Sequence, residues 1–307
     1  MKIYVAGHRG LVGSAVVRRI ETEGRHSWCG LDRSKLDLTN APLVREYLAE
    51  EKPDAVVMAA AKVGGILANQ RDPVEFLTQN LKIQTAILES AHQQGIAKLI
   101  FLGSSCIYPK ITHQPISEDQ LMTGQLEETN KSYALAKLTG VQLVDSYRTI
   151  HGHNWVSLLP TNLYGPNDSF DSANSHVIPA LVDRFLNAKR NSDAAVEVWG
   201  SGEPLREFLH SDDLAGAITY LLDQPTLHHG TFNVGSGEEI SISALAYLIR
   251  DLVGYEGQIR FDKDKPDGTH RKLLDSSRIH NLGWKPQVSL EQGLREVIDE
   301  RRSTTMP

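Results

Sequence analysis

The sequence predicts an α/β protein built on a Rossmann-type, doubly wound parallel sheet, with a smaller second α/β domain. Three observations lead to this prediction. Short apolar segments alternate with segments of helical periodicity as far as Leu102, which is the pattern of β–α crossovers. A glycine-rich turn follows the first apolar segment, and a length of 307 residues suits about two domains.

The individual elements follow from the periodicity. Strands are predicted at residues 2–6, 27–31, 54–60 and 98–102, and helices at residues 11–23, 42–51 and about 73–94. Helices between short apolar strands imply right-handed crossovers and a parallel sheet that is covered on both faces. After Pro166 the alternation loosens, and Cys29, in the middle of the second predicted strand, is expected in the core.

Composition and charge exclude several classes of protein. The net charge is −6 and there is no basic block, so neither nucleic acid nor an anionic membrane is expected as a partner. Two cysteines provide no disulfide framework, and the spacing of His151, His153, His228 and His229 suits no metal site; no metal is predicted. Without a signal-peptide pattern or an apolar run of about 18 residues, a cytoplasmic protein is expected.

The glycine-rich turn has the sequence Gly7-His-Arg-Gly10-Leu-Val-Gly13. Glycines allow the backbone to turn tightly and to approach a pyrophosphate, whose charge is met by the N-terminus of the following helix. The spacing is G-x-x-G-x-x-G and not the dinucleotide fingerprint G-x-G-x-x-G. Its place directly after the first strand nevertheless favours dinucleotide binding over a turn without a ligand.

Two adjacent residues at the end of the second predicted strand bear on the choice of coenzyme. Asp32 would accept hydrogen bonds from the ribose of NAD, whereas Arg33 would pair with the 2′-phosphate of NADP. Arg9 in the glycine turn adds a second cation and favours NADP. The residues themselves leave the choice open.

A second pattern carries catalytic chemistry. Tyr133 and Lys137 are four residues apart, so on a helix they share one face. An ammonium beside a phenol is expected to lower the pKa of the phenol and to make it a usable proton donor. A serine at a strand end, Ser104, lies about thirty residues upstream. Cys106, two residues further on, is either a packing residue or a chemical group presented at the strand end.

These motifs together resemble the extended short-chain dehydrogenase/reductase family, and later segments resemble its nucleotide-sugar members. Those segments are Leu159-Pro-Thr-Asn-Leu-Tyr-Gly-Pro166, Val198-Trp-Gly-Ser-Gly202 and Arg206-Glu-Phe-Leu-His-Ser-Asp-Asp-Leu214. Five more resemble the branch that converts GDP-4-keto-6-deoxy-D-mannose to GDP-L-fucose: Gly7-His-Arg-Gly10, Ala59-Ala-Ala-Lys-Val-Gly-Gly65, Gly103-Ser-Ser-Cys-Ile-Tyr-Pro-Lys110, Asn174-Ser-His176 and Lys265-Pro-Asp-Gly-Thr269. The resemblance covers nearly the whole chain.

The resemblance implies an NADPH-dependent 3,5-epimerisation and 4-reduction. It gives Cys106 and His176 the role of an acid/base pair for epimerisation, with Cys106 as base, although the direction of proton transfer stays open. Ser104 would polarise the C4 carbonyl, Tyr133 would protonate its oxygen, and Lys137 would hold the nicotinamide ribose. Alternatives are the related branch that makes GDP-L-colitose, a plain nucleotide-sugar 4-epimerase, and a non-catalytic dinucleotide sensor.

The resemblance also implies the contacts to the ligands. Coenzyme contacts are expected from Gly7, Arg9, Gly10, Leu11, Val12, Gly13, Arg33, Asp37, Leu38, Leu102, Gly103, Ser105, Lys137, Pro160, Asn162, Leu163 and His176. Contacts to the GDP-sugar are expected from Arg184, Trp199, Arg206 and Asp267. Residues 1–165 and about 207–237 would form the NADP-binding domain, and about 166–206 and 238–307 the substrate-binding domain. A homodimer is implied as well.

Overall fold

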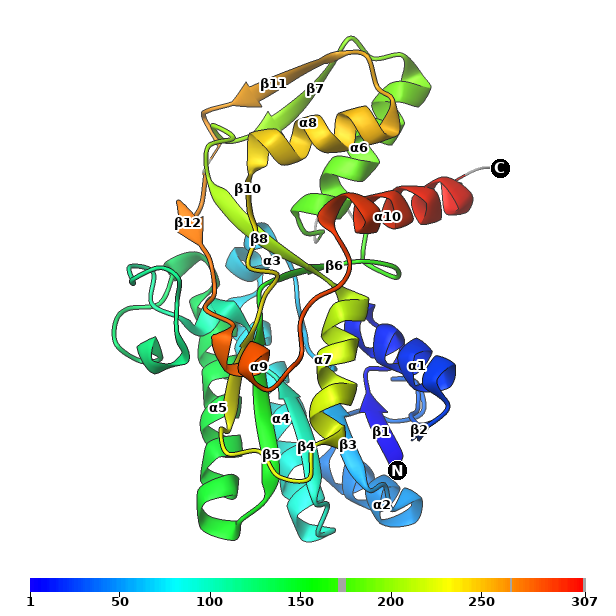
Figure 1. Cartoon of the computed structure of the whole chain (residues 1–307), viewed down its shortest axis with the longest axis vertical. Coiled ribbons are helices and arrows are strands. Elements are labelled where there is room, and N and C mark those ends of the chain that lie inside the picture. Colours follow the sequence, from blue (N-terminus) through cyan, green and yellow to red (C-terminus); the bar gives the residue numbers. More distant parts are fainter. Residues whose placement is uncertain (171–174, 266, 306–307) are drawn as a thin grey trace.

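A six-stranded parallel sheet forms the lower part of the molecule (Figure 1). The structure is a computed structural model that describes residues 1–170, 175–265 and 267–305. Asn174 and Pro266, which belong to two of the quoted sequence segments, lie outside the described residues. The strands of this sheet are β1 (Lys2–Ala6), β2 (Ser27–Cys29), β3 (Ala55–Met58), β4 (Lys98–Leu102), β5 (Asn154–Pro160) and β9 (Thr231–Val234).

The strand order of this sheet is β2-β1-β3-β4-β5-β9, and every neighbouring pair is parallel. The predicted Rossmann-type fold is therefore confirmed. From β1 the chain goes outward to β2 and then returns to the other side of β1 as β3. Open α/β sheets bind ligands outside the carboxyl ends of the strands at such a reversal, and the glycine turn lies there, directly after β1.

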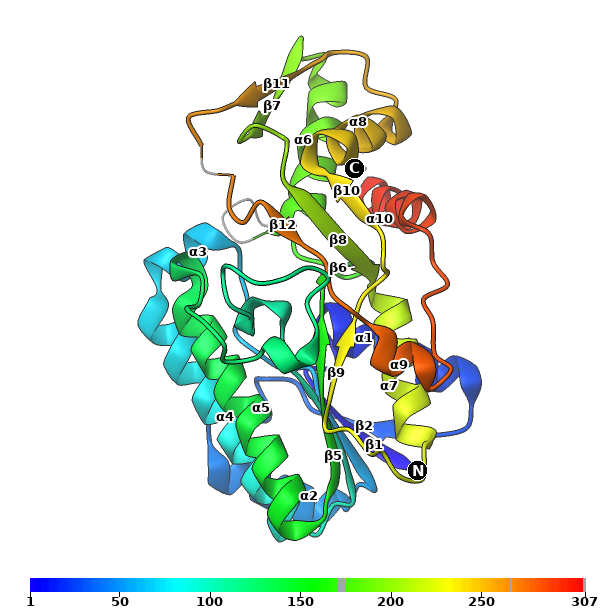
Figure 2. The same cartoon turned by 60° about the vertical axis from the view of Figure 1, so that its left-hand side comes forward.

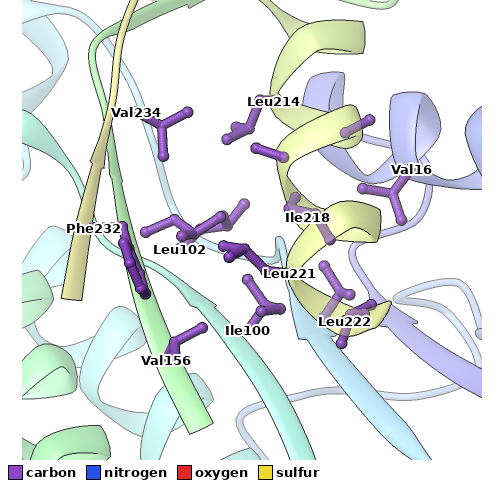
Figure 3. Close-up of a cluster of buried hydrophobic side chains, with 14 of the residues drawn as sticks. Val16, Ile100, Leu102, Val156, Leu214, Ile218, Leu221, Leu222, Phe232 and Val234 are labelled. Atoms are coloured by element: carbon purple, nitrogen blue, oxygen red, sulfur yellow. The ribbon is translucent and has the colours of Figure 1, made fainter. Parts of the chain in front are cut away.

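Helices cover both faces of this sheet and bury two separate cores. Helices α1 (Leu11–Glu23) and α7 (Ser211–Asp223) pack on one face, and α2 (Ala41–Glu51), α4 (Pro73–Gln93) and α5 (Lys131–His151) pack on the other. Figure 3 shows the first core, where apolar side chains of α7 meet those of β4, β5 and β9: Leu214, Ile218, Leu221 and Leu222 against Ile100, Leu102, Val156, Phe232 and Val234.

Some local predictions need correction. The strand expected at residues 27–31 ends at Cys29, and that cysteine is half-buried at the strand end, not in its middle. The strand expected at 54–60 is limited to Ala55–Met58. A short helix, α3 (Ile66–Arg71), was not expected because its six residues are too few to show a helical period.

A second group of elements lies above the sheet in Figure 1 and has its own core. Strand β8 (Leu205–His210) pairs with β6 (Asn162–Tyr164), β10 (Glu239–Ser241) and β12 (Arg271–Lys272), and β7 (Ala195–Trp199) pairs with β11 (Gln258–Asp262). Helices α6 (Val177–Asn191), α8 (Ile242–Val253) and α10 (Leu290–Thr305) cover these strands, and α9 (Ser277–Asn281) lies beside β9. The predicted domain boundaries stay a prediction.

A buried asparagine joins this second group to the segment that follows β4. The side-chain amide of Asn233, on β9, donates to the carbonyl oxygens of Ile116 and Asp275, at 2.8 and 3.1 Å. Its amide oxygen accepts the hydroxyl of Tyr108 at 2.6 Å. One side chain therefore holds three segments that are remote in sequence.

Among the described residues, we find no helix that is both long and apolar enough to cross a membrane.

Replacing Asn233 with alanine should lower the free energy of unfolding markedly. The substitution leaves the Tyr108 hydroxyl without its acceptor and the carbonyl oxygen of Asp275 without its donor, whereas the carbonyl oxygen of Ile116 still accepts the backbone amide of Asp275 at 2.9 Å. Each buried unsatisfied group costs about 1–3 kcal/mol, so we expect a loss of at least about 2 kcal/mol. Urea unfolding followed by circular dichroism measures it. Asn281→Ala, at an exposed position in α9, is the control, and equal midpoints for the two variants would contradict the assignment.

Candidate active site

The glycine turn brings the backbone close to two neighbouring segments. Gly7 has φ = +84°, a conformation that favours glycine, and the amide of Gly10 donates to its carbonyl at 3.0 Å. A Cβ atom on Gly13 would lie 2.0 Å from the same carbonyl oxygen, and a Cβ on Gly7 would lie 2.7 Å from the amide nitrogen of Ala60. Helix α1 thus begins directly at the turn, and this cradle fits a dinucleotide pyrophosphate.

The two adjacent residues that bear on the choice of coenzyme differ in their ion-pair partners. The Asp32 carboxylate lies 2.7 Å from Nε of Arg9 and 3.3 Å from Nε2 of His8. Arg33 is exposed and forms no ion pair with any described residue. Asp32 is therefore occupied by Arg9, and Arg33 is the cation available to a phosphate.

The segment after β4 carries the first catalytic candidates. Ser104 begins a short 3₁₀ turn, and its hydroxyl oxygen accepts the backbone amide of Cys106 at 3.2 Å. Ser105 is buried, whereas Ser104 and Cys106 are only partly buried. A Cβ on Gly103 would lie 2.5 Å from a methyl group of Leu159, so the chain leaves β4 in close contact with β5.

Helix α5 presents Tyr133 and Lys137 to this segment. The Tyr133 side chain forms a hydrogen bond with that of Ser104. The Lys137 ammonium is buried and donates to the carbonyl of Leu102, the last residue of β4, at 2.6 Å. The structure therefore brings Ser104, Tyr133 and Lys137 together at the carboxyl end of β4, beside Cys106.

The expected lowering of the pKa of Tyr133 by Lys137 is wrong. Burial, with the neighbouring Cys106, raises the pKa of Tyr133 above its ordinary value, and the hydrogen bond from Ser104 only partly offsets this. The Lys137 Nζ lies 6.0 Å from the centroid of the tyrosine ring, and it donates its hydrogen bond to the carbonyl of Leu102 instead. Burial lowers the pKa of Lys137 itself to about 8.

One residue near Cys106 was not found from the sequence. The ammonium of Lys272, on β12, lies 3.9 Å from the Cys106 sulfur. The ammonium can donate a hydrogen bond to the sulfur, which is the atom that would accept a proton from a substrate. Lys272 is 166 residues further along the chain and belongs to no quoted motif, so only the pairing of β12 with β8 brings it there.

His176 lies at the N-terminus of α6 and is exposed. Burial raises the pKa of the Asp168 carboxyl group, and the electrostatic interaction with His176 partly offsets that rise. No hydrogen bond or ion pair joins His176 to Cys106 among the residues that the structure describes. The two members of the expected acid/base pair are thus presented from different elements without direct contact.

The predicted sugar-binding residues gather around β7 and the start of β8. Trp199 is 43% exposed. The guanidinium of Arg184 lies 5.3 Å from the centroid of its ring, and the ammonium of Lys265 lies 5.7 Å from it. Arg206 donates to the carbonyl of Asp267 at 3.4 Å, and burial lowers its pKa. Lys265 was not predicted as a site residue. An exposed aromatic ring with two cations beside it can hold a flat, anionic ligand.

The remaining predicted coenzyme residues lie in three places. Leu11 and Val12 open helix α1, Asp37 and Leu38 follow β2, and Pro160, Asn162 and Leu163 follow or end β5. Two hydrogen bonds from the Thr39 backbone and hydroxyl lower the pKa of Asp37, so its carboxylate is occupied within its own turn. The side-chain amide of Asn162 donates a hydrogen bond to the carbonyl oxygen of Glu207 at 2.9 Å. Their contacts to a coenzyme stay a prediction.

This fold and site define a dinucleotide-dependent oxidoreductase of the short-chain dehydrogenase/reductase type. The glycine turn lies at the reversal of strand order, and a serine, a tyrosine and a lysine meet at the end of β4. The sequence profile described as the NAD dependent epimerase/dehydratase family matches residues 3–235, and the chain belongs to this family. The resemblance stated from the motifs is confirmed.

Individual relatives extend the similarity over nearly the whole chain. GDP-L-fucose synthase 1 of Arabidopsis thaliana is 52% identical over 299 residues, covering 97% of this chain and 92% of the plant protein. GDP-L-colitose synthase of Yersinia pseudotuberculosis is 37% identical over 298 residues, covering 97% and 96%. A solved GDP-L-fucose synthetase from Naegleria fowleri bound to NADP has a TM-score of 0.91 at 29% identity, covering 99% of this chain and 93% of that chain.

The lowered pKa of Lys137 predicts a pH-dependent stability. Between a folded pKa of about 8 and an unfolded value near 10.4, the unfolded chain binds the proton and the folded chain does not. Stability from this group therefore rises with pH in that window, by up to about 1.4 kcal/mol per pH unit, and the destabilisation is fully present below pH 8. Lys137→Met lacks this contribution.

Urea unfolding at pH 7.5, 8.5 and 9.5 measures the effect. The difference in unfolding free energy between the natural chain and Lys137→Met should shift in favour of the natural chain as pH rises. Lys131→Met, an exposed position in the same helix, should show a difference that does not vary with pH. A constant difference for Lys137→Met as well would show that burial does not perturb this lysine.

Proposed function

We propose that this chain converts GDP-4-keto-6-deoxy-D-mannose to GDP-L-fucose by NADPH-dependent 3,5-epimerisation and 4-reduction. The observation that carries the proposal is the presence of Cys106 beside Ser104 and Tyr133. A reductase needs the serine, the tyrosine and the lysine at one carbonyl, but it has no use for an additional thiol there. The 52% identity to a GDP-L-fucose synthase over nearly the full chain supports the same reaction.

Epimerisation begins with Cys106. The C4 ketone acidifies the protons on C3 and C5, and the Cys106 thiolate, next to the Lys272 ammonium at 3.9 Å, removes one of them. The negative charge moves to the C4 oxygen, where the hydroxyls of Ser104 and Tyr133 stabilise it. His176 returns a proton to the opposite face of the same carbon, which inverts it, and the two groups then exchange the proton they carry.

Reduction follows at the same carbonyl. A bound nicotinamide supplies the hydride for C4. Tyr133 donates its proton to the C4 oxygen, and Ser104 keeps that oxygen within reach. Lys137 holds the ribose of the coenzyme and, as an ammonium near the phenol, favours loss of its proton. This role requires Lys137 to turn partly from Leu102, to which it donates in the free protein.

The GDP-sugar is proposed to lie between β4 and β7. Arg184 and Arg206 pair with the diphosphate, and Trp199 offers its exposed ring to a flat part of the nucleotide. Asp267 accepts the backbone amide of Ser201 at 2.7 Å and so shapes the loop that would contact the sugar nucleotide. On the coenzyme side, Arg33 is proposed to bind the 2′-phosphate and the glycine turn the pyrophosphate.

A cytoplasmic location and a homodimer belong to the same proposal. Both cysteines are free thiols, as in a reducing compartment. The resemblance of the motifs to the family supports the homodimer. Sedimentation velocity of the full chain tests the oligomeric state.

The proposed reaction is tested by identifying the product. The chain is incubated with NADPH and GDP-4-keto-6-deoxy-D-mannose, or with the analogue that lacks the 3-hydroxyl, and the sugar is identified by NMR. We expect GDP-L-fucose from the first substrate at the higher kcat/KM. Preference for the 3-deoxy analogue would assign the colitose branch instead, and a product with only C4 altered would overturn the epimerase assignment.

Cys106→Ser should abolish epimerisation and spare reduction. A serine hydroxyl keeps the size but ionises far above neutral pH, so exchange of the C3 and C5 protons with deuterated water should fall by about 10²–10⁴-fold. The C4 ketone should still be reduced, without inversion. Tyr133→Phe should abolish reduction and leave epimerisation partly intact, and Cys29→Ser is the matched control. Exchange at the natural rate in Cys106→Ser would make Cys106 a packing residue.

Arg33→Ala should reduce the preference for NADPH over NADH. Asp32 is held by Arg9 and His8, so removal of Arg33 leaves the 2′-phosphate without its cation while the NAD-type ribose contact is unaffected. The ratio of kcat/KM for NADPH to that for NADH should fall by at least about tenfold, the range of one charge-assisted interaction. An unchanged ratio would show that another residue reads the phosphate; Arg45→Ala, on α2, serves as the control.

A further inference from the structure

Three histidines meet at the end of the sheet opposite the catalytic site. His92 lies in the last turn of α4, His151 ends α5, and His153 precedes β5; we call these three residues the histidine cluster. Helices α4 and α5 lie side by side in Figures 1 and 2 and pack closely along their length. Their C-terminal ends therefore bring His92 next to two histidines that are about sixty residues away in sequence.

The imidazole rings are in contact. Nδ1 of His92 and Nε2 of His153 are 2.8 Å apart. The His92 ring lies with its centroid 4.4 Å from that of His151, and the rings of His151 and His153 are 6.0 Å apart. We propose that the histidine cluster is a binding site for a divalent metal ion that favours imidazole ligands, with Zn²⁺ as the representative ion.

The distance between the two facing nitrogens suits such an ion. Zinc binds histidine nitrogen at 2.0–2.1 Å with tetrahedral angles, so two ligating nitrogens lie about 3.3 Å apart. The His92 and His153 nitrogens need to separate by only about 0.5 Å to reach this value. The ion would take the place of the proton that the two rings share in the free protein.

His151 can supply the third ligand once its ring turns, because in the structure its nitrogens do not lie close to both facing nitrogens. Its side chain is exposed, so it can rotate without disturbing the core. Gly152, between His151 and His153, has φ = +70°, which reverses the chain and brings both neighbours to the side of His92. With three imidazoles in place, water would complete a tetrahedral site.

The electrostatic surroundings favour a cation. Helices α4 and α5 both end at the cluster, and the C-terminus of a helix carries about half a negative charge. The neutral form of an imidazole is the form that ligates a metal ion. The other ionisable groups nearby are Tyr147, which contacts all three rings, and the exposed Glu89.

A packed layer beneath the cluster holds His153 in position. The His153 ring stacks on Trp155 with centroids 4.4 Å apart and an interplanar angle of 8°. Trp155 is fully buried and donates its indole N–H to the carbonyl of Ile96 at 2.9 Å. A ligand whose orientation is set by buried neighbours loses little freedom on binding a metal.

Titration of the full chain with ZnCl₂ in a calorimeter tests the proposal. The Cys106→Ser background is used throughout, so that the thiol of the catalytic site does not compete for the ion. We expect one site that His151→Ala weakens by at least about tenfold, because even loss of an outer partner of a metal site costs 10- to 100-fold. His151 is exposed, so this variant keeps its fold; circular dichroism checks it.

His228→Ala/His229→Ala is the matched control, since it removes two exposed histidines elsewhere and should leave the affinity unchanged. His92→Gln, which keeps a polar group in the half-buried position, should weaken binding like His151→Ala. Thermal unfolding adds a second readout, because Zn²⁺ should raise the midpoint of the parent and not of either cluster variant. Absence of Zn²⁺ binding, or equal affinity in all variants, would overturn the proposal, and neither result bears on the proposed reaction.

Discussion

A buried ammonium joins the catalytic helix to the sheet. Lys137 donates to the carbonyl of Leu102 at 2.6 Å, and this bond holds the first turns of α5 against the end of β4. Because Tyr133 lies one turn earlier on the same face, it is brought to Ser104. Burying a charged group is costly unless the group is hydrogen-bonded. The bond to Leu102 that offsets this cost for Lys137 is therefore also the bond that positions Tyr133.

The site also depends on cross-links between the two halves of the chain. The carboxylate of Glu207, fully buried on β8, accepts the backbone amides of Gly237 and Leu274, at 2.8 and 3.1 Å. These bonds hold the segments before β10 and after β12, and so fix the strand that carries Lys272. The thiol of Cys106 comes from the nucleotide-binding sheet, but the cation beside it comes from the other half. Epimerisation chemistry therefore requires both halves to be folded together.

Two sets of proton-transfer groups at one carbonyl distinguish this site from that of a simple reductase. Ser104 and Tyr133 are proposed to act on the oxygen of the substrate, and Cys106 and His176 on the carbons beside it. His176 is exposed at the start of α6 and so comes from a different element than the thiol. In the free protein the phenol is protonated, since burial raises its pKa, which is the state a proton donor requires.

The sequence by itself determined the parallel sheet, the glycine turn and the placement of Tyr133 and Lys137 on one face of a helix, because each depends on spacing within one or two elements. It also indicated Cys106, through its place after a strand-end serine. Tertiary structure alone decided the rest: Lys272 reaches Cys106 across 166 residues, Arg9 occupies Asp32, and His92 meets His153. Packing also decided the hydrogen-bond partner of Lys137. Its buried ammonium donates to the carbonyl of Leu102 and not to the phenol of Tyr133. Such contacts form where helices and strands that are remote in sequence pack together, so the local spacing of residues cannot predict them.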